Sequence, residues 1–182
     1  MHYARVLKYG GPGPAGMIGK WASLDDRLTN GIAMGGLPEH NPELGRCHLW
    51  CGSINKHGYG TIGDGYKVFK VHRLAWERAY GPIPTGRQID HRCFVRHCVR
   101  PDHLRLATSK QNNEHLRGAK RNSSSGVWGV FPAGNRWMVK VGHNGKQIYF
   151  GTYATLEEAE KVAIARRNEL HTYNDLDREE AS

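Results

Sequence analysis

The stretch IDHRCFVRHCVRPDHL, residues 89–104, decides how we expect this chain to fold. Cys93 and Cys98 lie five residues apart in it, and His103 follows five residues later. Two thiolates and an imidazole at this short spacing suit a tetrahedral zinc ion. Small modules often need such a metal because they bury little apolar surface. We therefore expect a fold built around a metal-pinned loop.

The fourth zinc ligand is expected upstream, where the chain carries Cys47 and Cys51. We assign Cys47, although Cys51 could replace it, because residues four apart on a strand point to the same side. His97 could likewise replace His103. The competing interpretation is that the cysteines are small apolar core residues. A closed four-ligand site would stabilise the fold and take no part in chemistry.

The elements around this loop place three further polar residues. Residues 47–54, 59–62 and 67–71 read as short strands, and 71–80 have helical spacing of apolar residues. Asp90 and His91 end a strand at about residues 87–91. Thr108 and Gln111 form a capping box for a helix over 109–117, which puts Asn112 in its first turn.

His91, Asp90 and Asn112 suit the hydrolysis of a phosphodiester. A neutral histidine can take a proton from water near pH 7. The amide oxygen of Asn112 and the carboxylate of Asp90 are hard ligands of the kind that Mg²⁺ or Mn²⁺ prefers. The competing interpretation of His91 is an ordinary surface histidine.

The pattern Asp90-His91, Cys93, Cys98 to Leu104 and Asn112 resembles the HNH endonucleases with a ββα-metal site, especially the His-Cys box homing enzymes and related phage enzymes. The resemblance covers about residues 46–117. It implies that His91 is the general base, that Asn112 binds magnesium, and that Cys93, Cys98, His103 and one upstream cysteine bind zinc. Arg100 stands where many relatives have an asparagine that orients the loop or the base, which leaves the support of His91 open.

Charge and hydropathy narrow the possible partners. Lys and Arg outnumber Asp and Glu by 26 to 17, which gives a formal net charge of +9 and favours a nucleic acid partner. We expect double-stranded DNA. No apolar run is long enough to span a membrane, and the N-terminus lacks a secretion signal core. We therefore expect a cytoplasmic protein, either bacterial or encoded by a phage in its host.

The C-terminal part reads as three antiparallel strands over 127–131, 136–141 and 146–153, followed by a helix. Asn144-Gly145 is a hairpin signal, and Thr155 and Glu158 form a capping box. Residues 126–130, 136–137, 145–146 and 150–153 resemble the plant APETALA/ethylene-response-factor DNA-binding domain over about residues 124–172. That resemblance implies DNA recognition by the sheet. The expected contacts are Trp128, Arg136, Lys140, Lys146 and Tyr149, with a core position as the alternative for Trp128 and Tyr149. Trp137 and Phe150 are expected in the core.

The expected fold class is α+β, with a zinc-stabilised ββα-metal HNH module followed by a three-stranded antiparallel sheet and one helix. The expected divisions are an N-terminal arm over 1–45, which includes the extended segment 10–16, the nuclease over 46–117, a linker over 118–125, the sheet domain over 126–172 and an acidic tail over 173–182. The oligomeric state is open.

These observations predict a metal-dependent DNA endonuclease that nicks or cuts both strands. The resemblance implies 5′-phosphate and 3′-hydroxyl products. In the nuclease part, Arg73, Arg96 and Arg100 are the candidate DNA contacts, and the competing interpretation of Arg73 is an exposed structural arginine. Two alternatives stay open: a DNA-binding or regulatory protein with weakened catalysis, which Arg100 favours, and a zinc-stapled structural phage protein.

Overall fold

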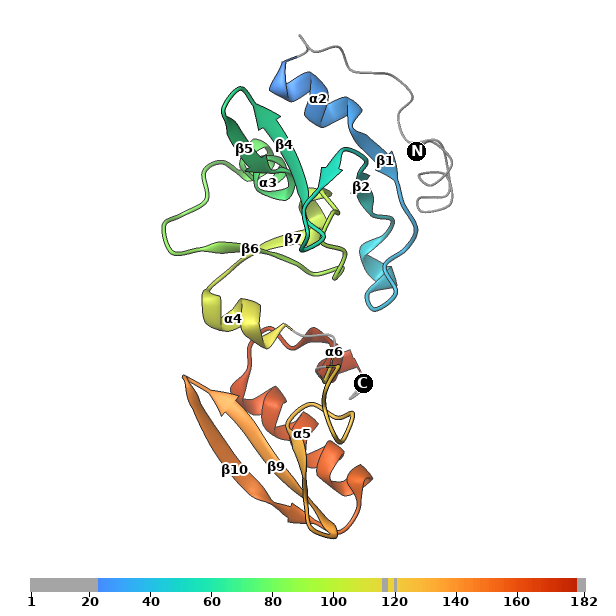
Figure 1. The fold of residues 1–182 in the computed structure, drawn as a ribbon, viewed down its shortest axis with the longest axis vertical. Coiled ribbons are helices and arrows are strands. Elements are labelled where there is room, and N and C mark those ends of the chain that lie inside the picture. The colour runs from blue at the N-terminus through green and yellow to red at the C-terminus, as the bar shows by residue number, and fades with distance from the viewer. Residues whose placement is uncertain (1–22, 116–117, 120, 180–182) are drawn as a thin grey trace. The chain divides into compact units, whose positions relative to one another are not determined.

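The contacts within the chain divide it into two compact units, shown in Figure 1. The computed structural model describes residues 23–115, 118–119 and 121–179. The first unit ends at Ala107 and the second begins at Thr108, and each has its own buried apolar cluster. Among the described residues, no helix is both long and apolar enough to cross a membrane.

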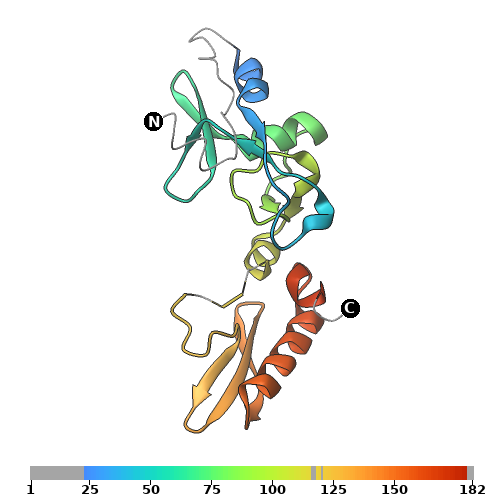
Figure 2. The same cartoon turned by 90° about the vertical axis from the view of Figure 1, so that its right-hand side faces the viewer.

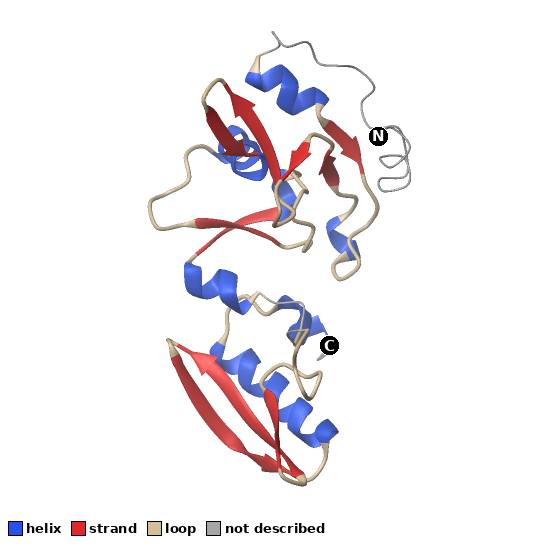
Figure 3. Ribbon diagram, in the orientation of Figure 1, coloured by secondary structure: helices blue, strands red, loops and turns tan. Residues whose placement is uncertain are grey.

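Short elements make up the first unit, which Figure 3 colours by secondary structure. In chain order they are α2 (Leu24–Asn30), β1 (Ile32–Met34), the 3₁₀ turn η1 (Pro42–Leu44), β2 (His48–Trp50), β3 (Ser53–Ile54), β4 (Gly60–Asp64), β5 (Lys67–Lys70), α3 (Val71–Tyr80), β6 (Gln88–His91), η2 (Pro101–His103) and β7 (Leu104–Ala107). The helix expected over 71–80 is confirmed.

Trp50 is the largest side chain in the main core of this unit, where it packs with Val71 and Val99. Glycines surround its indole ring. A Cβ atom added to Gly60 would come within 2.6 Å of Cδ1 of Trp50, and similar clashes would arise at Gly52. The backbone of β4 can therefore lie against the ring only because residue 60 has no side chain.

Residues 23–45 correct our expectation of an N-terminal arm. Leu28 on α2 is buried in the same core as Trp50, and β1 pairs antiparallel with β2, with Ile32 opposite Trp50. An element of seven residues and a strand of three are too short to show a clear hydrophobic period. Residues 10–16, which we expected to be extended, lie outside the described residues.

A two-stranded antiparallel ribbon, β6 with β7, carries the residues expected to be catalytic. Asp90 lies opposite Arg105 and His91 lies opposite Leu104. The sequence predicted β6 within a residue, but it placed 104–107 in a loop. β7 has four residues and follows directly on the 3₁₀ turn η2, so it shows too few alternations to stand out.

The second unit contains α4 (Ser109–Glu114), β8 (Val130–Ala133), β9 (Arg136–His143), β10 (Lys146–Tyr153), α5 (Leu156–Leu170) and α6 (Asp175–Glu179). Both predicted capping boxes are present, at Thr108 and at Thr155. α4 ends at Glu114, earlier than expected, and residues 116–117 of the predicted helix lie outside the described residues.

The three strands form one antiparallel sheet, as the sequence predicted, and their order in it is β10-β9-β8. Figure 2 shows α5 running along one face of this sheet. Val139 and Val141 of β9 and Ala159 and Ala163 of α5 form the buried layer between them. β8 begins at Val130 instead of residue 127, because the chain turns through left-handed backbone at Gly126 and Gly129 first.

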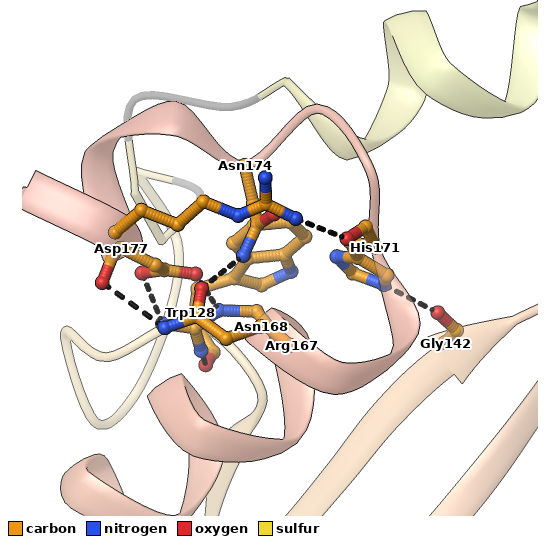
Figure 4. Close-up of polar contacts among 8 residues, drawn as sticks. Trp128, Gly142, Arg167, Asn168, His171, Asn174 and Asp177 are labelled. Atoms are coloured by element: carbon orange, nitrogen blue, oxygen red, sulfur yellow. Dashed lines mark hydrogen bonds and ion pairs between the residues drawn. The ribbon is translucent and has the colours of Figure 1, made fainter. Parts of the chain in front are cut away.

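Residues 173–179 are part of the second unit, which corrects the expectation of an acidic tail. Arg167 on α5 is buried, forms a bidentate ion pair with Asp177 at 2.6 and 2.7 Å, and donates to the carbonyl oxygen of Trp128 (Figure 4). Asn174 is also buried. The acidic composition of this segment could not show that one of its carboxylates, that of Asp177, pairs with a buried arginine instead of facing solvent.

Candidate nuclease and metal sites

Four buried side chains from separate segments of the first unit meet in one cluster. Cys47 precedes β2, Cys93 and Cys98 lie in the loop after β6, and His103 ends the 3₁₀ turn η2. Their ligand atoms, one from each residue, all lie within 4.8 Å of one another. These are the four residues that the sequence assigned to zinc, and their arrangement could hold a metal ion.

The imidazole of His103 is oriented as a metal ligand. Nε2 lies 2.9 Å from the carbonyl oxygen of Leu44, so that nitrogen carries the proton and donates. Nδ1 keeps its lone pair and lies 3.5 Å from Sγ of Cys47 and 3.6 Å from Sγ of Cys98. Tetrahedral zinc, with sulfur at about 2.3 Å and nitrogen at about 2.1 Å, separates sulfur from nitrogen by about 3.6 Å. The donor set therefore fits zinc.

The charges of the three sulfur atoms also favour a cation. Hydrogen bonds from the thiols of Cys47 and Cys93 lower the pKa of the Cys98 thiol to about 2. Hydrogen bonds to Cys47 and Cys98 and burial raise the pKa of the Cys93 thiol far above its ordinary value. Without a metal, the cluster thus accommodates one thiolate and opposes a second. A divalent cation would remove that repulsion and allow more sulfurs to ionise.

The alternative zinc ligands lie outside this cluster. The thiol of Cys51 is directed to the carbonyl oxygen of Leu49, at 3.5 Å, although Cys51 is also buried. His97 accepts a hydrogen bond from the amide of Trp50 through its carbonyl oxygen, and its ring is not among the grouped ligands. The geometry therefore brings together Cys47 and His103 rather than Cys51 and His97.

His91, at the end of β6, has one ring nitrogen fixed by the neighbouring loop. Nε2 lies 3.1 Å from the carbonyl oxygen of Cys98. A carbonyl only accepts, so Nε2 carries the proton and the lone pair of the neutral ring is on Nδ1. Burial lowers the pKa of His91, which favours that neutral form. The Cys98 carbonyl thus orients the imidazole of His91, whose support the sequence left open.

Two rings pack against that of His91. The ring of His72, on α3, lies edge-on to it with a centroid distance of 4.9 Å, and the ring of Tyr59 lies 5.9 Å away. Lys70 Nζ and Arg96 Cζ lie 5.3 and 5.7 Å from the centroid of Tyr59. Two cations therefore lie on the ring that borders the candidate base.

Sequence reasoning did not assign roles to Tyr59, His72 or Lys70. The signal that could have found His72 is a polar side chain at the start of a helix, among positions that carry the helical apolar period. Tyr59 and Lys70 gave no comparable signal, because their meeting depends on how β4, β5 and α3 pack.

The magnesium ligands expected from the sequence are Asp90 and Asn112. Asp90 is buried on β6, and Oδ2 forms an ion pair with Nε of Arg105 at 2.8 Å. Asn112 lies in α4, which belongs to the second unit. Their joint action with His91 stays a prediction.

The arginines expected to contact DNA in the first unit differ in their contacts. Arg96 is exposed and donates to the carbonyl oxygen of His57, at 2.9 Å. Arg100 donates to the carbonyl oxygen of Arg46, at 2.9 Å, and lies 3.6 Å from a carboxylate oxygen of Asp102. Arg73 is half-buried on α3. Arg100 thus already pins the segment before Cys47, and DNA contact remains a prediction for all three.

The outer face of the sheet, opposite α5, carries most of the other predicted DNA contacts. Lys140 and Tyr149 are register partners on β9 and β10, and Tyr149 is 57% exposed. Arg136 donates to the carbonyl oxygen of Thr152, at 3.1 Å. No acidic residue occurs between 126 and 153, so this face is basic as well as aromatic.

A pocket of about 740 Å³ adjoins this face within the second unit. Its lining includes Lys140, Lys146, Trp128, Phe131 and Lys110. Trp128 differs from the expectation of an open contact, because Arg167 stacks on its ring at 4.8 Å and His171 lies 5.5 Å away. Trp128 is therefore largely a packing residue with one edge at the pocket.

Comparison with known proteins agrees with this geometry. A family model described as HNH endonuclease matches residues 69–114. The chain is 39% identical to Protein 7.7 of Escherichia phage T7 over 70 residues, which are 38% of this chain and 54% of that protein. It is 37% identical to Protein 3.8 of the same phage over 108 residues, 58% of this chain and 88% of that protein.

A further relative is the uncharacterized gene 5.3 protein of Enterobacteria phage T3, which is 49% identical over 64 residues, 32% of this chain and 63% of that protein. The chain thus spans about half the length of Protein 7.7 and most of Protein 3.8. No solved structure matches the chain significantly. Because the match with Protein 3.8 covers nearly all of that protein, the chain belongs to the phage protein family of Protein 3.8, with an HNH endonuclease domain at residues 69–114.

Proposed function

We propose that this protein is a divalent-metal-dependent endonuclease of the homing or phage type that nicks or cuts double-stranded DNA. One observation carries the proposal. In a segment that matches the HNH endonuclease model, the hydrogen bond from Nε2 of His91 to the Cys98 carbonyl leaves a neutral imidazole with its lone pair on Nδ1. That is the state that a general base needs to deprotonate water.

In this mechanism Nδ1 of His91 takes a proton from the water that attacks the scissile phosphate. The carbonyl of Cys98 keeps the ring in the required tautomer and orientation. Since Cys98 is also in the Cys₃His cluster, zinc bound there would fix the loop that holds the base. Zinc therefore has a structural role in this proposal.

Asn112 and Asp90 are the residues that we propose to hold Mg²⁺ or Mn²⁺, and Arg105 orients the Asp90 carboxylate. The cation would supply charge stabilisation to the phosphate and the leaving 3′ oxygen. The products would be 5′-phosphate and 3′-hydroxyl ends. Arg73, Arg96 and Arg100 are proposed to contact the DNA backbone near this site.

The second unit is proposed to bind double-stranded DNA through the outer face of its sheet, as the resemblance to the APETALA/ethylene-response-factor domain implies. Support comes from the exposed Tyr149 beside Lys140 and from the absence of acids over 126–153. Arg136, Lys146 and one edge of Trp128 complete the proposed contacts. A sheet with aromatic and basic side chains can enter the major groove.

Plasmid cleavage tests the proposal. The wild-type protein with Mg²⁺ should nick or linearise the plasmid, and chelation of Mg²⁺ should stop the reaction. The substitution His91→Ala should slow cleavage by about 10²-fold or more, because it removes the base. His57→Ala is the matched control, since His57 is exposed and we assign no role to its ring. Equal rates for the wild type and His91→Ala would refute the assignment.

The replacement of the usual asparagine by Arg100 favours a second candidate function, a DNA-binding or regulatory protein with weakened catalysis. In that case the wild-type protein would bind DNA in a gel-shift assay but leave the plasmid intact with either cation. A protein that neither binds nor cuts DNA would instead fit the alternative of a structural phage protein whose fold is stabilised by zinc.

A further inference from the structure

His72 is a buried histidine beside the candidate base to which no role is yet assigned. It is the second residue of α3, and only 4% of its surface is exposed. Its ring contacts the ring of His91 at a centroid distance of 4.9 Å and an interplanar angle of 63°, and the centroid of the Tyr59 ring lies 5.2 Å from that of His72. The three rings come from different segments of the first unit, so their meeting reflects the fold.

The two ring nitrogens of His72 have different surroundings. Nδ1 is buried and has no hydrogen-bond partner among the described residues. Nε2 is not one of those buried unpartnered atoms, and no partner for it is found among the described residues, so it is the nitrogen left to meet a ligand. A buried N–H without an acceptor is rarer in proteins than a buried lone pair without a donor. The proton therefore belongs on Nε2, which makes it an available donor.

A phenylalanine or leucine at residue 72 would fill the same space without leaving a buried nitrogen unpaired. Burying a polar atom without a partner destabilises a protein, so its presence calls for an explanation outside packing. The position next to His91 supplies one. Preorganised neutral donors near a scissile group can stabilise charge as it develops in the transition state.

The charges around His72 keep its ring neutral. Burial, with smaller contributions from His91, Lys70 and Arg73, lowers the pKa of His72 to about 3. The titratable and charged groups that face it are thus one imidazole, one lysine and one arginine, and Tyr59 packs on the ring. The donor would consequently be present over the whole pH range in which His91 can act as a base.

We propose that His72 is a further catalytic residue, whose Nε2–H donates a hydrogen bond to a nonbridging oxygen of the scissile phosphate while His91 deprotonates the attacking water. No covalent bond to His72 forms or breaks. The inference rests on the proposed nuclease function and adds a substrate-binding residue to it.

The first test compares the substitutions His72→Phe and His72→Gln with the wild type in single-turnover plasmid cleavage. Phe keeps the ring packing and removes the donor, so the rate should fall about ten- to hundredfold with unchanged zinc content. Gln offers an amide N–H and should recover part of that loss. The pH–rate profile should keep its shape in both variants, because His72 does not titrate there. A wild-type rate for His72→Phe would overturn the proposal.

A phosphorothioate at the scissile position provides a second test, because sulfur accepts hydrogen bonds poorly. If His72 contacts the substituted oxygen, sulfur should slow the wild type but should not slow His72→Phe further. Equal slowing of both proteins by each phosphorothioate isomer would overturn the contact.

His72→Phe could lose zinc or show an altered circular dichroism spectrum, which would mean that it does not fold normally. In that case the cleavage rates of His72→Gln, which has a donor, and His72→Leu, which has none, are compared. Equal rates for these two variants overturn the proposal. The two hypotheses fail differently. A wild type that does not cleave refutes the nuclease function. A wild type that cleaves, with His91→Ala inactive and His72→Phe fully active, refutes only the role of His72.

Discussion

At the scale of single residues, Cys93 gives the clearest test of the metal site. Its thiol is buried among Cys47, Cys98 and His103, whereas Cys51 is also buried but lies outside that group. We expect Cys93→Ser to lower the zinc content measured by elemental analysis and to lower the melting temperature of the first unit. Folding and metal binding are coupled in such small sites, so loss of one ligand destabilises both.

Cys51→Ser is the matched control for this experiment and should retain stoichiometric zinc. Retention of zinc by Cys93→Ser, or its loss only from Cys51→Ser, would show that the ligand set is wrong. Removal of zinc with a strong chelator should reproduce the effect of Cys93→Ser on the melting temperature.

The sequence led to several residues of this site because their chemistry is local. Cys93, Cys98 and His103 lie in one short stretch, and their spacing alone suggested a metal. The contacts of His72 and Tyr59 with His91 are different, because they join residues far apart in the chain. Spacing carries no information about such contacts, and only the packing of α3 against β6 and β4 reveals them.

At the scale of elements, α4 depends on a buried carboxylate. Glu114 ends this helix, accepts from the amide of Thr172 at 3.1 Å and pairs with Lys110 at 2.5 Å. Burial opposes ionisation of Glu114, but the hydrogen bonds from Lys110 and Thr172 outweigh it and lower the pKa of Glu114 below its ordinary 4.5. The ionised carboxylate therefore stabilises the folded state near neutral pH.

The substitution Glu114→Gln should accordingly lower the melting temperature at pH 7. The difference from the wild type should shrink as the pH falls below about 4.5 and through the lower pKa of the folded state, because the wild-type carboxylate then becomes neutral as well. Thermal melts at a series of pH values measure this. A difference that persists unchanged at pH 3 would show that the charge of Glu114 is not the cause. Glu157→Gln, at an exposed position on α5, is the control.

Elements bounded by capping boxes or a characteristic turn sequence were predicted well, whereas short elements without such local signals were missed. The capping boxes at Thr108 and Thr155 and the Asn144-Gly145 turn fixed the starts of α4 and α5 and the β9–β10 hairpin. α2, β1 and β7 were missed, since elements of three to seven residues are held by tertiary contacts more than by their own period.

At the scale of the whole molecule, the excess of positive charge predicts binding that depends on salt. Each phosphate that a lysine neutralises releases condensed counterions. If Lys140 contacts a phosphate, Lys140→Gln should lower the slope of log Kobs against log salt concentration by about 0.9. Lys161→Gln should leave the slope unchanged, because Lys161 is an exposed residue of α5. Fluorescence anisotropy with labelled duplex DNA measures both, and equal slopes for Lys140→Gln and the wild type would remove Lys140 from the interface.

The division of the chain was predicted only in outline. Two units with separate cores were expected, and the sheet with its helix is present. The first unit extends to α2, because Leu28 packs in its core, and the second extends to α6, because Asp177 pairs with the buried Arg167. Composition does not reveal either contact.

The Cys₃His cluster also sets the order of events during protein synthesis. Cys47 and His103 are 56 residues apart, so Cys47 leaves the ribosome long before its partners do. The cluster cannot be completed until His103 has emerged from the exit tunnel. Val99, a core partner of Trp50, also emerges late, so the partly made chain exposes apolar surface that would be prone to aggregation.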